Sequence, residues 1–426
     1  MGSFSQQVRL SALLNRRFIG ISFMSSSATG AAVLIVLGIL TAFGPLSMDM
    51  YLPALPELVD FFRTTPGKAQ LTLSAFTIAF GAGQLVYGPV SDQLGRRNVL
   101  LVGIGIYALA SILCVFADTI DELILARLFQ AIGGAAGIVL SRAIIRDLFD
   151  KLEGARALSL MLLIPSLAAL IAPFVGGYLL KFFDDWRLIF WVLSASGVVA
   201  FILGVMKLPE THPPEKRTKS TIKRVMRDYG VVLCHRRAAG YMICGGLSFA
   251  TMFAQLSGTP FIYIDLFGVP PEDFGILFGL NVFAIMIGSY LNSRLVIRFG
   301  VRRMLAVGTT IALFGGFALV ISVAYGGFGL FGVVIPVVIF MMPHNMVNAN
   351  ATAGAMEYFP HLAGTASAML GFVRFGTGAV VGALVGYFHD GTASPMAYII
   401  ACCVIGSALA FWFLTDDSSE EAAKPV

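Results

Sequence analysis

The sequence predicts an all-α membrane protein whose twelve transmembrane helices form two pseudo-symmetric six-helix bundles. Of its 426 residues, 57% are hydrophobic and only 12% are charged, whereas a typical globular protein has about 25% charged residues. The charged residues gather in short segments between long apolar runs. One long polar stretch, at residues 209–237, divides these runs into two sets.

Each apolar run is long enough to cross a bilayer, because a hydrocarbon core of about 30 Å needs about 20 helical residues. In the first set, the predicted helices lie near residues 32–56, 69–91, 98–117, 121–145, 156–181 and 186–207. In the second set, they lie near residues 238–265, 273–296, 303–324, 328–356, 361–388 and 394–414. Several connections are so short that the helices they join must be antiparallel neighbours.

The polar break defines the expected domain organisation. It consists of a cytoplasmic N-terminal tail, a first bundle, a cytoplasmic central loop, a second bundle and a cytoplasmic C-terminal tail, at residues 1–30, 31–208, 209–237, 238–415 and 416–426. Corresponding turns of the two bundles carry a Gly followed by an Arg pair, at residues 95–97 and 300–303. A duplicated six-helix unit would leave such an echo.

The distribution of Lys and Arg predicts that both termini are cytoplasmic. With the N-terminus inside, 23 of the 29 Lys and Arg residues fall in inner segments and 4 fall in outer loops. Cytoplasmic segments of membrane proteins carry such an excess of positive charge. The other two, Arg127 and Arg374, lie within helices.

Composition and motifs also exclude several classes of function. The net charge of +5 comes from scattered loop residues, not from a basic face that could bind nucleic acid. The five cysteines form no CxxC pair, so we expect neither a disulfide framework nor a metal site. The sequence has no Walker A, HExxH or GxSxG motif. We therefore expect no enzyme and no cofactor, and a gradient must supply the energy.

Three ionisable side chains lie deep in predicted helices: Asp49, Arg127 and Arg374. Each costs at least about 2.5–3.5 kcal/mol at a helix centre, so each needs a partner or a wet cavity. Asp49 is the only carboxylate well inside a span, and helix rise places it at a depth similar to that of Arg127. We expect the pair to couple proton binding to transport. The alternative is a static ion pair that fixes helix packing.

Polar and small residues form two stripes at helical spacing, which we expect to face the bundle interior. The stripes are Arg127, Gln130, Gly134, Gly137 and Ser141, and Gly364, Ser367, Gly371, Arg374 and Gly378. The predicted substrate cavity comprises Tyr51, Gln130, Asn281, Asn345 and Arg374. Two alternatives stay open: Arg374 could bond only to backbone carbonyls, and the amides could only join neighbouring helices.

Two further motifs predict conformational roles. Between the second and third helices, we expect a conformational latch formed by Gly88, Asp92, Gly95, Arg96 and Arg97. Its acid can pair with a helix N-terminus and its arginines with C-terminal carbonyls. In the fifth helix, Pro173, Gly176 and Gly177 predict a bend with close helix contact. The alternatives are topology alone for the arginines and a tolerated kink for the proline.

At these positions the chain resembles the major facilitator superfamily. The stretch Gly88-x-x-x-Asp92-x-x-Gly95-Arg96-Arg97 looks like the family's loop signature between helices two and three. Arg127-Leu-Phe-Gln130-Ala-Ile-Gly133 is similar to the helix-four motif of proton-coupled members, and Pro173-x-x-Gly176-Gly177 resembles the helix-five antiporter motif. That antiporter motif usually has Gly before the Pro, where this chain has Ala172.

More specifically, three segments look like the bicyclomycin-resistance (Bcr/CflA) branch of drug:proton antiporters. They are residues 45–56 (PLSMDMYLPALP), 359–367 (FPHLAGTAS) and 372–376 (FVRFG). The resemblance covers residues 32–415 and implies a bacterial inner-membrane exporter of bicyclomycin, sulfonamides or phenicols in exchange for protons. It also implies that Asp49 is the proton-binding carboxylate and Arg127 its coupling partner.

The sequence thus predicts a monomeric, proton-coupled efflux antiporter that works by alternating access. Its expected partners are a small drug-like substrate, protons and the lipid bilayer, with no nucleic acid. An uptake symporter for a small metabolite uses the same fold and is the first alternative. A membrane receptor or scaffold that transports nothing is the second, although it would have little use for an intramembrane acid.

Overall fold

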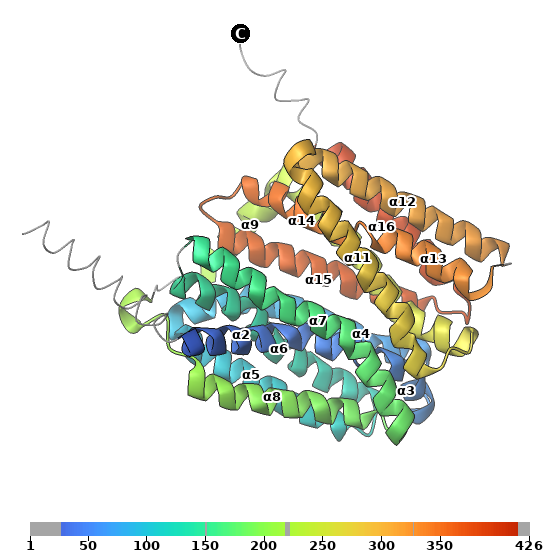
Figure 1. Ribbon diagram of the computed structural model, residues 1–426, viewed down its shortest axis with the longest axis horizontal. Helices are drawn as coiled ribbons and strands as arrows, with labels where there is room; N and C mark the ends of the chain where they lie inside the picture. The colour runs from blue at the N-terminus through green and yellow to red at the C-terminus, as the bar shows by residue number, and fades with distance from the viewer. Residues whose placement is uncertain (1–26, 150, 218–221, 327, 416–426) are drawn as a thin grey trace, which may run out of the picture.

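The computed structural model describes residues 27–149, 151–217, 222–326 and 328–415. Within these ranges it contains helices and no strand, and twelve spans are long and apolar enough to cross a membrane. This confirms the predicted fold class. In Figure 1 the helices from α2 to α8, blue to green, occupy one half, and those from α10 to α16, yellow to red, occupy the other.

The first half begins with a span that changes helix type. It consists of α2 (Ser27–Asp49), a 3-10 turn η1 (Leu52–Ala54) and α3 (Leu55–Phe61). The other helices are α4 (Pro66–Leu94), α5 (Arg96–Val115), α6 (Ile120–Leu148), α7 (Lys151–Phe183) and α8 (Arg187–Lys207). Local signals set several ends. For example, Thr119 and Glu122 form a capping box at the start of α6.

The second half repeats this plan. Its helices are α10 (Arg236–Pro260), a π-helical turn η3 (Phe261–Leu266), α11 (Pro271–Phe299), α12 (Val301–Tyr325), α13 (Gly329–Met341), α14 (His344–Glu357), α15 (Ala363–Tyr387) and α16 (Ser394–Leu414). Gly95 (φ +100°) and Gly300 (φ +80°) separate corresponding helix pairs in the two halves. Because only glycine adopts such backbone angles readily, both turns require it.

The stretch between the halves contains more structure than the predicted central loop. It includes a 3-10 turn η2 (Pro214–Lys216) and the helix α9 (Ile222–Cys234). The buried side chains of Tyr229 and Val232 belong to the same apolar cluster as residues of α10, α14 and α15. The Tyr229 hydroxyl also donates to the Leu85 carbonyl oxygen of α4 at 2.8 Å. This helix therefore contacts both halves.

The tenth span is also interrupted, at Met342–Pro343, where α13 ends and α14 begins. Proline lacks the N–H that would continue the α-helical ladder. Gly288 of α11 packs against this break, since a Cβ there would lie 1.8 Å from the Met342 carbonyl oxygen. The break precedes a run of amide side chains on α14.

The two halves meet along α4 with α15 and along α7 with α11. At one end, a Cβ added to Gly67 would lie 2.7 Å from the Gly386 carbonyl oxygen, and Lys181 Nζ pairs with Glu272 Oε1 at 3.0 Å. Toward the other end of the same α4–α15 pair, a Cβ on Gly88 or Gly364 would have nothing within 4 Å. We call these the Lys181 end and the Arg96 end. The halves are thus joined at the Lys181 end and part toward the Arg96 end.

Candidate functional site

Asp49 lies at the end of α2, where the first span turns into η1. Its side chain is 8% exposed, and it is the only buried Asp or Glu among the described residues. Within that part of the chain, no hydrogen bond or ion pair joins its carboxylate to another side chain. A buried carboxylate without a partner is costly to keep charged. The site is therefore suited to a group that gains and loses a proton.

The helix-five motif supports the backbone next to Asp49. A Cβ on Gly176 of α7 would lie 1.8 Å from the Met50 carbonyl oxygen. One residue further, a Cβ on Gly177 would lie 2.4 Å from the Pro271 carbonyl oxygen of α11. These two glycines therefore bring α7 into backbone contact with the Asp49 segment on one side and with the second half on the other. Pro173 lies inside the same helix.

Arg127 of α6 is fully buried in an aromatic box. Its guanidinium carbon lies 4.3 Å from the ring centroid of Phe76, 4.8 Å from that of Tyr51 and 5.7 Å from that of Phe190. Such rings stabilise a cation through their negative faces. Arg127 Nη1 also donates to Gln130 Oε1 at 2.7 Å. Among the described residues, Nε and Nη2 have no hydrogen-bond partner.

The expected Asp49–Arg127 ion pair is absent from the described residues of this structure. The rings around the guanidinium take the place that a carboxylate would fill. Tyr51, two residues after Asp49, belongs to this box, and its hydroxyl bonds to the Thr72 hydroxyl. The structure thus connects Asp49 to Arg127 through a short stretch of chain, not through a direct contact.

The second half contains a polar pocket of about 370 Å³. Seven residues line it: Ser289, Asn292, Asn345, Asn348, Ala349, Thr352 and Arg374. They come from α11, α14 and α15 and lie on the Arg96 side of the inter-half contacts. Hydrogen bonds fix the walls, from Asn345 Nδ2 to Ser289 Oγ at 3.0 Å and from Asn350 Nδ2 to Asn292 Oδ1 at 2.8 Å.

Arg374 holds the wall of this pocket. Its Nη2 donates to the Asn348 carbonyl oxygen at 2.7 Å and to the Thr352 hydroxyl. The backbone bond that we considered as an alternative is therefore present, but the side chain lines the pocket as well.

The residues predicted to form one cavity lie in three places. Asn345 and Arg374 line the pocket, whereas Tyr51 and Gln130 belong to the Arg127 box. Asn281 lies elsewhere on α11, and both polar atoms of its buried amide are without a hydrogen-bond partner in the described part of the chain. That all five residues line one substrate cavity stays a prediction.

Sequence reasoning missed Arg142, which it counted only among the positive charges of the inner segments, although the residue falls within the predicted helix at 121–145. In the structure Arg142 lies within the helix, its side chain is exposed, and its charge acts on Arg374 of the second half. Ser289, Asn292 and Thr352 were also missed. Each of these is a single polar residue on a long apolar helix, and nothing in the sequence indicated that they line the same pocket.

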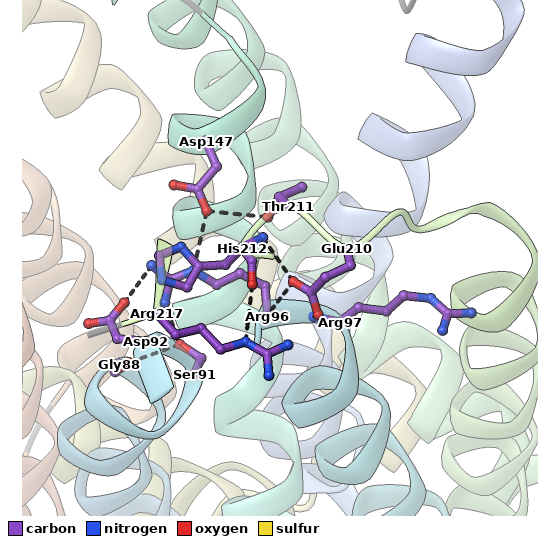
Figure 2. A network of polar contacts seen from close by, with 10 residues as sticks. All are labelled: Gly88, Ser91, Asp92, Arg96, Arg97, Asp147, Glu210, Thr211, His212 and Arg217. Atoms are coloured by element: carbon purple, nitrogen blue, oxygen red, sulfur yellow. Dashed lines mark hydrogen bonds and ion pairs between the residues drawn. The ribbon is translucent and has the colours of Figure 1, made fainter. Parts of the chain in front are cut away.

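The turn between α4 and α5 forms the network in Figure 2. Arg96, which is 3% exposed, pairs with Asp92 at 2.6 Å and with Asp147 of α6 at 3.3 Å. Its Nη1 donates to the Ser91 hydroxyl. Buried charges need such compensation, because an isolated one is expensive. Arg96 therefore ties α4 and α6 together at the start of α5.

The other residues of this network lie at helix ends. Arg97 donates to the carbonyl oxygens of Val205 and Leu208, both at 2.8 Å, at the C-terminus of α8. The Glu210 carboxylate accepts from the backbone N–H groups of Arg96 at 2.9 Å and Arg97 at 3.3 Å, at the N-terminus of α5. Both placements complement the helix dipoles. The sequence predicted the carbonyl contacts for both arginines and the N-terminal contact for Asp92, whereas Arg97 and Glu210 make these contacts in the structure and Asp92 pairs with Arg96.

The contacts shown in Figure 2 join elements of the first half and the segment that follows it. Gly88, the first residue of the predicted latch, has nothing within 4 Å of an added Cβ. In this conformation the turn therefore braces the first half. The role of these residues as a latch that favours one conformation stays a prediction.

Comparisons with known proteins agree with this architecture. The family model described as Major Facilitator Superfamily matches residues 37–383. The bicyclomycin resistance protein homolog of Haemophilus influenzae is 35% identical and covers 90% of this chain and 96% of its own. Multidrug resistance protein D of Escherichia coli is 31% identical, over 80% of this chain and 84% of its own.

Solved structures agree on the fold. A D-xylose-proton symporter superimposes with a TM-score of 0.73 at 16% identity, covering 91% of this chain and 98% of its own. The xylose transporter XylE of E. coli, in a partially occluded inward open conformation, gives a TM-score of 0.70 at 13% identity, covering 92% and 99%.

Proposed function

The chain belongs to the major facilitator superfamily, and we propose that it exports small drug-like molecules in exchange for protons. It is a transporter and not an enzyme. The relatives named for bicyclomycin, multidrug and chloramphenicol resistance support export as the direction. Because the halves join at the Lys181 end and part toward the Arg96 end, rocking about the contact between them would expose the interior alternately to each side.

One observation carries the proton-coupling part of this proposal. Asp49 is the only buried carboxylate in the described part of the chain, and it has no ion-pair partner there. An ion pair would have to be broken each time the carboxylate is protonated, and breaking buried pairs is costly. Without one, Asp49 can bind a proton in one state and release it in the other. Arg127 is coupled to this site through Tyr51, which follows Asp49 by two residues and whose ring packs on the guanidinium.

The orientation belongs to the same proposal. We place the Arg96 end in the cytoplasm, because the excess of Lys and Arg lies on that side of the spans. The structure then corresponds to a state closed toward the outside. A drug would reach the interior from the cytoplasm, and protons would reach Asp49 after the halves rock.

The test uses everted inner-membrane vesicles and radiolabelled chloramphenicol. Acidifying the vesicle lumen should drive the drug into the vesicles that carry the parent protein. Asp49→Asn should abolish this response, since an amide cannot carry the proton. In a second measurement, adding drug to the purified parent protein should release protons, and adding it to the variant should not.

Asp60→Asn is the matched control, because Asp60 lies in the same span but is exposed. It should leave the response to the gradient unchanged. Gradient-driven uptake or proton release that survives in Asp49→Asn would remove Asp49 from the mechanism. Loss of preloaded drug from the acidified lumen would instead identify an uptake symporter, and no response in the parent would favour a receptor or scaffold.

A further inference from the structure

The pocket beside Arg374 carries positive charge and no carboxylate. Its polar lining comes from Ser289, Asn292, Asn345, Asn348 and Thr352, together with Arg374. No Asp or Glu belongs to the lining. Among the described residues, no ion pair neutralises Arg374. A charged group at membrane depth needs a partner or water, and marks a pathway or a binding site.

Hydrogen bonding within the protein leaves part of this site unused. Arg374 employs Nη2 to hold α14, but its Nε is buried and has no partner in the described part of the chain. The Asn348 side-chain oxygen is likewise buried and unpaired there. Buried polar atoms are usually satisfied, so unsatisfied ones at a cavity point to an interaction that the protein alone does not supply.

A second arginine adds to the positive charge from the other half. Arg142 of α6 is exposed, and no hydrogen bond or ion pair within the described residues occupies its side chain. The positive charge of Arg142, on the first half, acts on Arg374, on the second. Like charges repel, and an anion between them would turn this repulsion into attraction.

We propose that the Arg374 pocket binds the negatively charged group of a transported molecule, so that this carrier prefers acidic drugs over neutral ones. The planar guanidinium matches a carboxylate or a deprotonated sulfonamide, because both offer two acceptor atoms side by side. The neutral amide and hydroxyl groups around it suit the polar remainder of such a molecule. This inference rests on the proposed export function and specifies its substrate class.

We also expect the affinity for the anion to depend on the conformational state of the transporter. Arg374 belongs to the second half and Arg142 to the first. A rocking motion changes the separation of the two halves, and therefore the contribution of Arg142 to the attraction. Arg142 would act as a positioning residue whose contribution to binding depends on the state of the transporter.

The experiment compares two matched pairs of probes on the purified full-length protein in nanodiscs. Sulfamethoxazole, which is largely ionised at neutral pH, is paired with its N-methylated derivative, which cannot ionise. Chloramphenicol succinate, an anion, is paired with neutral chloramphenicol. We expect the charged member of at least one pair to bind about tenfold more tightly, the difference that one charge-assisted interaction supplies.

Three variants test whether Arg374 and Arg142 cause the preference for the charged probe. Arg374→Gln should erase the preference, because it should weaken binding of the charged probe about tenfold more than binding of the neutral probe. Arg374→Lys should keep part of the preference, because it retains the charge without the planar fork. Arg142→Gln, which disturbs no described hydrogen bond, should reduce the preference even if Arg374→Gln fails to fold.

Arg294→Gln is the charge-matched control. Arg294 lies on α11 like Ser289 and Asn292, but its guanidinium stacks on the exposed ring of Tyr290, 5.5 Å from the ring centroid. It should retain the full preference. Equal affinity for charged and neutral members of both pairs, or a preference that survives in Arg374→Gln and Arg142→Gln, overturns the inference.

These experiments distinguish a failure of the anion-site inference from a failure of the proposed export function. Gradient-driven export of neutral chloramphenicol without any charge preference would support export and overturn the anion site. A charge preference lost in Arg374→Gln, without gradient-driven transport of any probe, would support the anion site and contradict proton-driven export.

Discussion

The packing of α7 depends on Gly176 and Gly177, which have no side chain. Each allows α7 to approach a backbone carbonyl more closely than any Cβ would permit. In a membrane, helices associate through such close packing, since lipid offers no hydrophobic driving force between them. The glycines therefore set the position of the Asp49 segment relative to α7 and that of α7 relative to the second half.

Gly176→Ala is expected to destabilise the protein, because its Cβ would lie 1.8 Å from the Met50 carbonyl oxygen. The backbone must move, and overpacking of this kind costs about 1–3 kcal/mol. Thermal unfolding in detergent should therefore show a lower Tm than in the parent. Gly364→Ala serves as the control, since its Cβ would meet nothing within 4 Å. Equal melting of the two variants would contradict this account of the helix-five motif.

The functional residues were only partly predictable. The rarity of ionisable groups in apolar helices was enough to single out Asp49, Arg127 and Arg374. Their partners were not predictable, because an aromatic box and a carboxylate are equally plausible neighbours for an arginine until the helices are placed. Arg142 was missed for a related reason, since it lies close to the cytoplasmic end of its predicted helix and was counted only as evidence for topology.

Among the elements, α5 has an N-terminus capped by a residue far away in sequence. Glu210 follows α8, yet its carboxylate accepts from the first two N–H groups of α5. Because a helix N-terminus carries a partial positive charge and unpaired donors, this carboxylate stabilises α5. The contact also fixes the start of the segment that connects the two halves.

Glu210→Gln should loosen the start of α5 without unfolding the protein. The loss of a cap costs about 0.5–2 kcal/mol, so amide hydrogen exchange in residues 96–99 should accelerate about tenfold. Mass spectrometry of peptides from this region measures the effect. Glu215→Gln is the comparison, because Glu215 is exposed and makes none of these contacts. Unchanged exchange at the start of α5 would show that the cap contributes nothing.

Element boundaries followed from the sequence where apolar runs and turn signals agree. The sequence did not reveal the interruption at Met342–Pro343, because the apolar run continues through it. It also concealed α9, whose buried face rests on Val225, Tyr229 and Val232 at helical spacing within a strongly charged segment. The many charged residues suggested a loop there. The helical spacing of the few apolar residues was the pattern that indicated a helix.

At the scale of the whole molecule, the division into two halves was predictable from the polar break, and the conformation was not. A transporter that works as proposed adopts states open to either side, and its sequence must encode both. The contacts that close a given state can be identified only once the positions of both halves relative to each other are known. Here those contacts are the glycine approaches of α4 with α15 and of α7 with α11, and the Lys181–Glu272 pair.

The Lys181–Glu272 pair leads to a prediction about the balance between these states. Its side chains are 47% and 21% exposed, and solvent screening keeps the contribution of such pairs small. Lys181→Glu should therefore shift the population away from the state closed at this end by up to about fivefold. Adding Glu272→Lys should restore the balance, because the pair reforms with reversed charges.

Distances between spin labels at Phe182→Cys and Ile276→Cys, both exposed positions on α7 and α11, report this shift after the five native cysteines are replaced by Ala. High salt should diminish the difference between parent and variant, since exposed charges are screened.

Lys68→Glu breaks the 3.5 Å pair with Asp121, which lies wholly within the first half, and should leave the label distances unchanged. If Lys68→Glu and Lys181→Glu moved the labels equally, or if the charge swap failed to restore the parent distribution, net charge at this end would be responsible. The pair across the boundary would then not help to close the transporter.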